Sequence, residues 1–167
     1  MYSGLSEEEK DNLAQELACF LRELHRLHIE ETDSYEEDMK LKYRDDRDML
    51  VKLISHKLDN RTASKLDDLF KGIFSNKDLL DNDKGLVHND FSCSNILFDT
   101  EKKRLSGVID FGDSCVSDID NDFYCLLEES EEELGREFGL KVLSHYGYKD
   151  VDRLLRKADF HDRYWCM

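Results

Sequence analysis

The 167-residue sequence contains no proline, although average usage of about 5% would give about eight. Because proline interrupts helices, its absence favours a chain that is mostly helical. The sequence also lacks any apolar run of about 20 residues, so it predicts no membrane-spanning helix. Its first residues, Met1-Tyr2-Ser3-Gly4, show no basic-then-apolar pattern and therefore predict no secretory signal peptide.

The sequence also has no closely spaced cysteine pair and fewer basic than acidic residues. The five cysteines are odd in number and form no C-x-x-C pair, which argues against a disulfide framework or a thiolate zinc site and favours the cytoplasm. There are 24 Lys and Arg residues against 39 Asp and Glu residues, which gives a net charge of −15. Because nucleic acids are bound through clustered basic residues, this balance argues against a nucleic-acid partner and favours cationic ones.

The helical signals are clear at the N-terminus. The length corresponds to one domain, or to a large piece of one. Ser6 and Glu9 form an S-x-x-E capping box, and apolar residues then recur every three or four positions to about His28, which predicts an amphipathic helix. Five more helical stretches are predicted: from a cap at Ser34, from a cap at Thr62, over 119–127, from Ser130 to about Tyr146, and from Val151 to the end.

The pattern changes in the middle of the chain. Short apolar runs at 86–88, 95–98 and 105–110 predict strands, and the polar segment 100–104 is expected to close a hairpin. After Asp110 the sequence predicts a return to helix. The expected fold class is therefore α+β and mostly α, with a small β-hairpin.

Residues 88–95 form the most informative segment of the sequence. They contain an H-x-D-x-x-x-x-N string made by His88, Asp90 and Asn95, and it lies between two predicted strands. Fifteen residues after Asn95, the sequence Asp110-Phe111-Gly112 follows a strand-like run. Each element alone is weak evidence, but in this order they match the catalytic loop and the metal-binding D-F-G of a kinase.

Phosphoryl transfer explains why these residue types are needed. Asp90 is predicted to accept the proton of the attacking hydroxyl. Asn95 and Asp110 are predicted to hold Mg²⁺ against the phosphates of ATP or GTP, so they are both the metal and the cofactor ligands. His88 is expected to organise the loop by hydrogen bonding. Ser92, in the same loop, is predicted to be a catalytic residue as well.

The same segments resemble the aminoglycoside phosphotransferase family, most closely its 2″-phosphotransferases. In this chain Asn89 stands where many members have glycine, and Ile119 where the family usually has proline. The resemblance implies a protein-kinase-like C-terminal lobe whose small partners are a nucleoside triphosphate and a polycationic aminoglycoside. It is carried by residues 86–92, 107–113 and 117–123, and is supported by residues 20–25 and 164–165.

The eight glycines form no G-x-G-x-x-G loop, and no predicted strand with a phosphate-pairing lysine precedes the motifs. In the family both features belong to an N-terminal nucleotide lobe, so the resemblance implies that this lobe is absent from these residues, through excision or truncation. The expected parts are then a helical subdomain over 1–75, a catalytic and metal-binding region over 86–112 and a helical substrate-binding part over 113–167. Alone, they are expected to be inactive.

Acidic residues are dense between Asp110 and Glu137, where eleven acids and one base give a charge of −10 in 28 residues. A solvated helix face explains most of the glutamates at 128–133, whereas a carboxylate-lined cleft would bind a polyamine sugar. The resemblance favours substrate contacts for Asp120, Glu137 and Trp165. Two further acids, Asp113 and Asp122, would either contact substrate or orient the loop backbone.

Two alternative functions remain open at this point. The chain could be a non-catalytic lobe that captures a cationic ligand through its acidic surface. It could also belong to a choline-, homoserine- or fructosamine-type kinase that shares the H-x-D and D-F-G core. The density of acids disfavours homoserine and fructosamine as substrates, but charge alone does not exclude choline.

Overall fold

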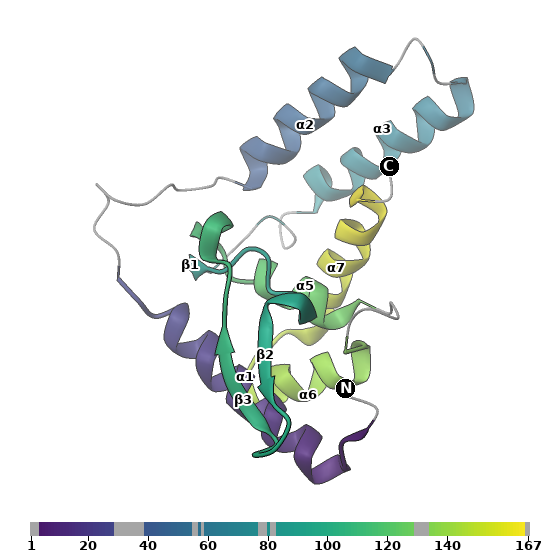
Figure 1. The fold of residues 1–167 in the computed structure, drawn as a ribbon. Helices are drawn as coiled ribbons and strands as arrows, with labels where there is room; N and C mark the ends of the chain where they lie inside the picture. The colour runs from purple at the N-terminus through teal and green to yellow at the C-terminus, as the bar shows by residue number, and fades with distance from the viewer. Residues whose placement is uncertain are drawn as a thin grey trace.

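A computed structural model describes residues 4–28, 39–54, 57, 59–76, 80, 83–128 and 134–165. The chain is mostly helical, with two pairs of short antiparallel strands, which confirms the expected fold class (Figure 1). None of the described helices has the length and low charge of a membrane-spanning segment. The helices are α1 (Glu7–Leu24), α2 (Met39–Ile54), α3 (Asn60–Ser75), α5 (Asn121–Leu127), α6 (Arg136–Tyr146) and α7 (Val151–Trp165).

Side-chain caps explain where the first helices begin. The capping box of α1 is confirmed: the Ser6 hydroxyl accepts the Glu9 N–H at 3.3 Å, and the Ser6 N–H donates to the Glu9 carboxylate at 2.7 Å. The cap predicted at Thr62 is wrong, because Asp59 caps α3 and its carboxylate accepts the Thr62 N–H at 2.7 Å. Asp and Thr are both favourable N-caps, so residue type alone does not distinguish them.

Two other predicted helix limits need correction. α1 ends at Leu24 rather than near His28. α6 begins at Arg136 rather than at Ser130, because Leu134 and Gly135 are not helical and Gly135 has a φ of 84°, a conformation that glycine adopts readily. The cap predicted at Ser34 lies outside the described residues.

The four strands are β1 (Lys84–Val87), β2 (Ile96–Asp99), β3 (Arg104–Val108) and β4 (Cys115–Asp118). β2 and β3 pair antiparallel around the turn at 100–103, which confirms the predicted hairpin. The return to helix predicted after Asp110 begins only with α5, because β4, a strand that was not predicted, comes first and pairs antiparallel with β1. A four-residue strand with mixed polar and apolar side chains depends on a partner distant in sequence, so its local pattern is uninformative.

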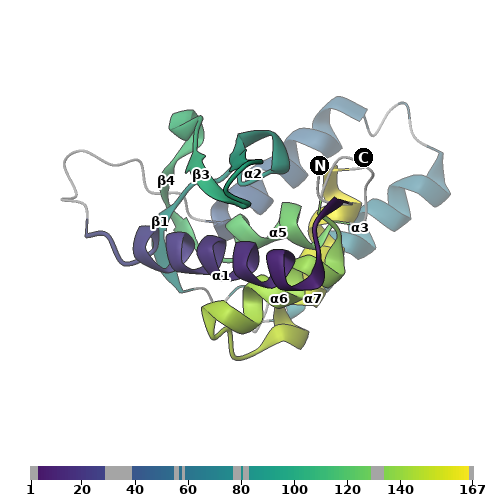
Figure 2. The same cartoon turned by 60° about the horizontal axis from the view of Figure 1, so that its bottom comes forward.

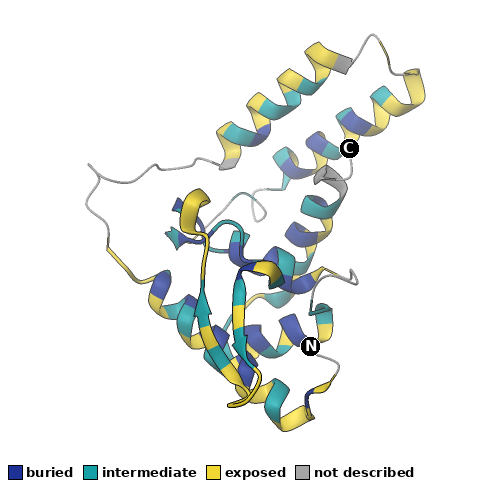
Figure 3. Cartoon of the chain, in the orientation of Figure 1, coloured by how far each residue is buried: buried dark blue, intermediate teal, exposed yellow. Residues whose placement is uncertain are grey.

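Two hydrophobic clusters hold the helices together. The main core lies among α1, α5, α6 and α7, and Figure 2 shows α1 running alongside α6. The second cluster joins α2 and α3 to the C-terminal half of α7 through Tyr43, Phe70 and Phe160. Much of the α2 surface is exposed (Figure 3). Because α1 shares its core with α5, α6 and α7, the division expected at residue 75 separates helices that pack together, and those boundaries stay a prediction.

Candidate active site

His88 joins the two predicted halves of the site. It follows β1, and its side chain is completely buried. Its Nε2 donates to the carbonyl of Ile109 at 2.8 Å, and its Nδ1 accepts the Asp90 N–H at 3.3 Å. The imidazole ring also lies 4.6 Å, between centroids, from the ring of Phe111. With both ring nitrogens engaged by backbone groups, His88 connects the loop to the D-F-G segment.

Asp90 and Asn95 are in direct contact. The amide Nδ2 of Asn95 donates both to the carbonyl oxygen and to the carboxylate Oδ2 of Asp90, each at 2.9 Å. Asp90 is half-buried, whereas Asn95 is 7% exposed. Within the described part of the chain, no hydrogen bond reaches Oδ1 of either residue. One carboxylate oxygen is therefore available for a substrate hydroxyl, and one amide oxygen for a cation.

A backbone hydrogen bond connects the segment before Asp110 to Asn95. The N–H of Ile109 donates to the Asn95 carbonyl at 3.0 Å, and Asp110 turns the chain with a φ of 64° into the short 3₁₀ helix Phe111–Asp113. Its carboxylate is exposed and accepts no hydrogen bond from the residues that the structure describes. Left-handed backbone is uncommon outside glycine, although Asp tolerates it better than most residues.

These two oxygen donors fit Mg²⁺. Magnesium prefers hard oxygen ligands and usually shares its site with substrate phosphates. The Asn95 Oδ1 and the Asp110 carboxylate are such ligands. Among the described residues, no three His, Cys, Asp or Glu side chains form a metal cage. Phosphate oxygens and water would supply the remaining ligands.

Asp122 supports the loop from α5. Its side chain is buried; Oδ2 accepts the His88 N–H at 2.9 Å, and Oδ1 accepts the Asn89 N–H at 2.7 Å. The ring of His25 donates to the same carboxylate at 3.1 Å, and the Tyr146 hydroxyl bonds the other nitrogen of that ring at 2.9 Å. The sequence analysis did not single out His25, because nothing close to it in sequence reveals its partners.

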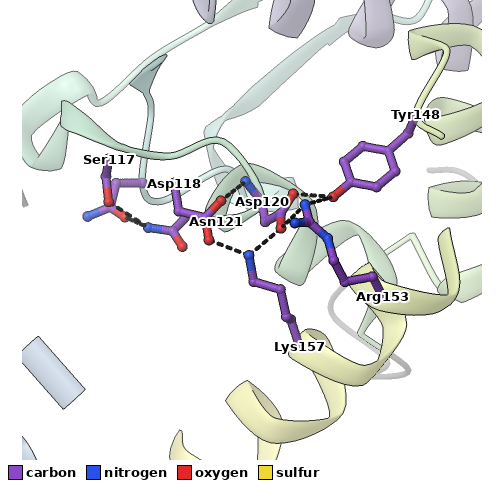
Figure 4. A network of polar contacts seen from close by, with 8 residues as sticks. Ser117, Asp118, Asp120, Asn121, Tyr148, Arg153 and Lys157 are labelled. Atoms are coloured by element: carbon purple, nitrogen blue, oxygen red, sulfur yellow. Dashed lines mark hydrogen bonds and ion pairs between the residues drawn. The ribbon is translucent and has the colours of Figure 1, made fainter. Parts of the chain in front are cut away.

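A buried charge network ties α7 to the turn between β4 and α5 (Figure 4). The Lys157 ammonium pairs with the carboxylates of Asp118 and Asp120, and all three side chains are at most 4% exposed. The Tyr148 hydroxyl donates to Asp120 at 2.5 Å, and the Arg153 guanidinium lies 3.5 Å from the same carboxylate. Burial and the nearby Asp120 raise the pKa of Asp118 to about 6. The sequence analysis missed Lys157, a single lysine with no local signal.

The structure places the predicted substrate residues at different depths. Asp120 and Asp122 are each 0% exposed: Asp120 accepts a bond from Lys157, and Asp122 accepts the N–H groups of His88 and Asn89, so their contacts with substrate stay predictions. In contrast, Asp113 and Glu137 are exposed, Asp113 in the short 3₁₀ helix and Glu137 in the first turn of α6. The side chain of Trp165 lies outside the described residues.

The Ser92 hydroxyl contacts another serine of the loop rather than the Asp90 carboxylate. Its hydroxyl is 2.8 Å from the hydroxyl of Ser94, which shares the same loop. The described contacts therefore place Ser92 in the loop without giving it a bond to Asp90.

The chain is similar in sequence and structure to known phosphotransferases. The sequence matches the phosphotransferase enzyme family over residues 2–160. It is 40% identical to the ADP-bound aminoglycoside phosphotransferase APH(2'')-Ib, with a TM-score of 0.87 over 98% of this chain and 57% of that chain. It is also 40% identical to APH(2'')-IIa in its gentamicin complex, with a TM-score of 0.87 over 98% of this chain and 56% of that one.

A third similar structure is a GDP and kanamycin complex of another APH(2'') enzyme. Its identity is 27% and its TM-score 0.84, over 96% of this chain and 54% of that chain. The present chain thus spans a little over half the length of these solved relatives.

Proposed function

The chain belongs to the phosphotransferase enzyme family, and from this membership we propose that it carries the catalytic loop of an aminoglycoside O-phosphotransferase, an antibiotic-resistance enzyme. The reaction would transfer the terminal phosphoryl group of ATP or GTP to an aminoglycoside hydroxyl. The observation that carries the proposal is the joining of Asp90, Asn95 and the D-F-G segment through side-chain and backbone bonds. The similarity to solved aminoglycoside phosphotransferases supports the substrate class.

We assign each group a role in that reaction. The substrate hydroxyl oxygen forms a bond to the terminal phosphorus, the bond from that phosphorus to the bridging oxygen breaks, and the nucleoside diphosphate leaves. The hydroxyl proton passes to the open carboxylate oxygen of Asp90. Asn95 keeps the Asp90 carboxylate in place through its amide nitrogen. When bound by the Asn95 Oδ1 and Asp110, Mg²⁺ would neutralise charge on the phosphates.

We expect the 167-residue chain to bind Mg²⁺ weakly without nucleotide. Magnesium gives up its water reluctantly, and Asn95 and Asp110 offer only part of a shell. Calorimetric titration of the chain with MgCl₂ should show weak heat or none, in the wild type and in Asp110→Ala alike. Glu101→Gln, an exposed change in the β2–β3 turn, is the control and should behave as wild type. A tight Mg²⁺ site in the chain alone would contradict this assignment.

The proposed substrate side depends on the acids that face solvent. Glu137 lies in the first turn of α6, and the exposed Asp113 follows the D-F-G segment. Carboxylates of this kind attract the ammonium groups of an aminoglycoside, and the overall charge of −15 adds long-range attraction. We keep Glu137, Asp113 and Trp165 as proposed substrate contacts. We assign Asp122 to holding the backbone of the catalytic loop and Asp120 to the buried network with Lys157.

We expect aminoglycoside binding and phosphate transfer to separate in these 167 residues. Binding of gentamicin or kanamycin should be measurable by calorimetry and should weaken with salt, because ion pairs are screened as the Debye length falls from about 10 Å at 0.1 M to about 3 Å at 1 M. Transfer of labelled phosphate should be undetectable, since the sequence contains no phosphate-covering glycine loop.

The decisive control adds the portion of the ADP-bound relative that this chain does not span. The complemented protein should transfer phosphate to an aminoglycoside. Binding that ignores salt would contradict the proposed role of carboxylates. If the complemented protein binds aminoglycosides tightly and never transfers phosphate, the chain is a binding lobe and the proposed function is wrong.

A further inference from the structure

The residue between His88 and Asp90 has an unusual backbone conformation. Asn89 has a φ of 67°, in the left-handed region that side chains other than glycine rarely adopt. Asparagine tolerates this region better than most residues, but it still needs surrounding contacts to stay there. Because Asp90 follows directly, the backbone at Asn89 sets the direction in which the Asp90 carboxylate leaves the loop.

The first turn of α5 supplies contacts to Asn89 on two sides. Asp122 accepts the Asn89 N–H at 2.7 Å. The amide Nδ2 of Asn121 donates to the side-chain Oδ1 of Asn89 at 3.0 Å. The Asn121 contact is the one that depends on Asn89 having a side chain, so it is specific to asparagine at that position.

Asn121 is itself held by contacts with β4 and follows residues that are paired with α7. Its Nδ2 lies 3.4 Å from the hydroxyl of Ser117, which is fully buried in β4 (Figure 4). The residues before it, Asp118 and Asp120, are linked by a 3.1 Å bond from the Asp120 N–H to the Asp118 carboxylate and are both paired with Lys157 of α7. A short side chain on a turn held by these buried contacts is a suitable anchor for a strained loop.

We propose that Asn121 is a positioning residue for Asp90. Its amide bond to the Asn89 side chain stabilises the left-handed backbone at Asn89 and so directs the Asp90 carboxylate toward Asn95. The structural part of this proposal stands on the contacts alone, and only its consequence for turnover rests on the proposed phosphotransferase function.

Four forms of the 167-residue chain test the structural part: wild type, Asn121→Ala, Asn89→Gly and the double variant. The measurement is amide hydrogen exchange at residue 89 by NMR. Asn121→Ala should speed this exchange about tenfold or more, because the Asn89 N–H is then less firmly held against Asp122. In the Asn89→Gly background the same change should have little effect, because glycine adopts positive φ without help and has no side chain to anchor.

Two further variants keep the test decisive. Ser117→Ala removes another neighbour of the Asn121 amide but leaves its bond to Asn89, so it should speed exchange at residue 89 less than Asn121→Ala does. Asn89→Ala removes the same bond from the loop side and also strains the backbone at positive φ, so it should speed exchange at least as much as Asn121→Ala, even if the latter proves poorly folded. Unchanged exchange in Asn121→Ala, or an equal effect in the asparagine and glycine backgrounds, would overturn the proposal.

The complemented enzyme provides the second readout. Asn121→Ala should lower kcat by about ten- to hundredfold, the size of effect expected from a misplaced reacting group, while KM for the aminoglycoside changes little. When residue 89 is already glycine, Asn121→Ala should lower kcat much less. A proportional rise in KM with unchanged kcat would overturn the positioning role. If the wild-type enzyme transfers no phosphate, the proposed function fails, whereas the exchange experiment still decides whether Asn121 holds the loop.

Discussion

Replacing Asp90 with asparagine should lower kcat of the complemented enzyme by about 10²–10⁴, the usual span for a lost general base. The substituted amide keeps an oxygen that can accept the Asn95 Nδ2 bond, so the loop should retain its shape. What disappears is the carboxylate that receives the hydroxyl proton. The measurement is steady-state transfer of labelled phosphate to an aminoglycoside, together with its binding constant from calorimetry.

The binding constant for the aminoglycoside should change far less than kcat in Asp90→Asn. Glu101→Gln provides a matched control, because it also replaces one carboxylate by an amide, on the exposed turn between β2 and β3. Its kcat should equal that of wild type. Turnover of Asp90→Asn within a few-fold of wild type would remove Asp90 from the role of base.

Replacing Lys157 with methionine should lower the free energy of unfolding by about 3–5 kcal/mol, the range seen when one partner of a buried ion pair is removed. Methionine fills a similar volume but leaves Asp118 and Asp120 buried without their ammonium partner. Urea unfolding followed by circular dichroism measures the loss. Lys102→Met is the control: that lysine is largely exposed beside Asp99, so its removal should change stability little.

The decrease in the free energy of unfolding caused by Lys157→Met should also depend on pH. The folded-state pKa of Asp118 is already raised from 3.8 to about 6, and removing the nearby cation raises it further. A carboxyl group with a raised pKa contributes stability below its ordinary pKa and loses that contribution as pH rises through the folded value. The variant should therefore be less destabilised at pH 5 than at pH 8. An equal loss at both pH values would show that the Asp118 charge does not dominate the effect.

Several features of this protein follow from residues close together in sequence. The capping box of Ser6 and Glu9 starts α1, and the polar turn at 100–103 closes the β2–β3 hairpin. The five-residue spacing between Asp90 and Asn95 is enough to predict that they share a site. Such features depend on hydrogen bonds and periodicities that span a few positions, so the local pattern contains most of the information.

The tertiary structure alone decided which acids belong to the interior. In the sequence, Asp118, Asp120 and Asp122 look like part of one acidic stretch that could face a cationic substrate. In the structure all three are buried, the first two against Lys157 and the third beneath the backbone of the catalytic loop. A carboxylate is buried only where partners compensate for its lost water. These partners come from the segments that follow α1 and β1 and from α7, far away in the sequence.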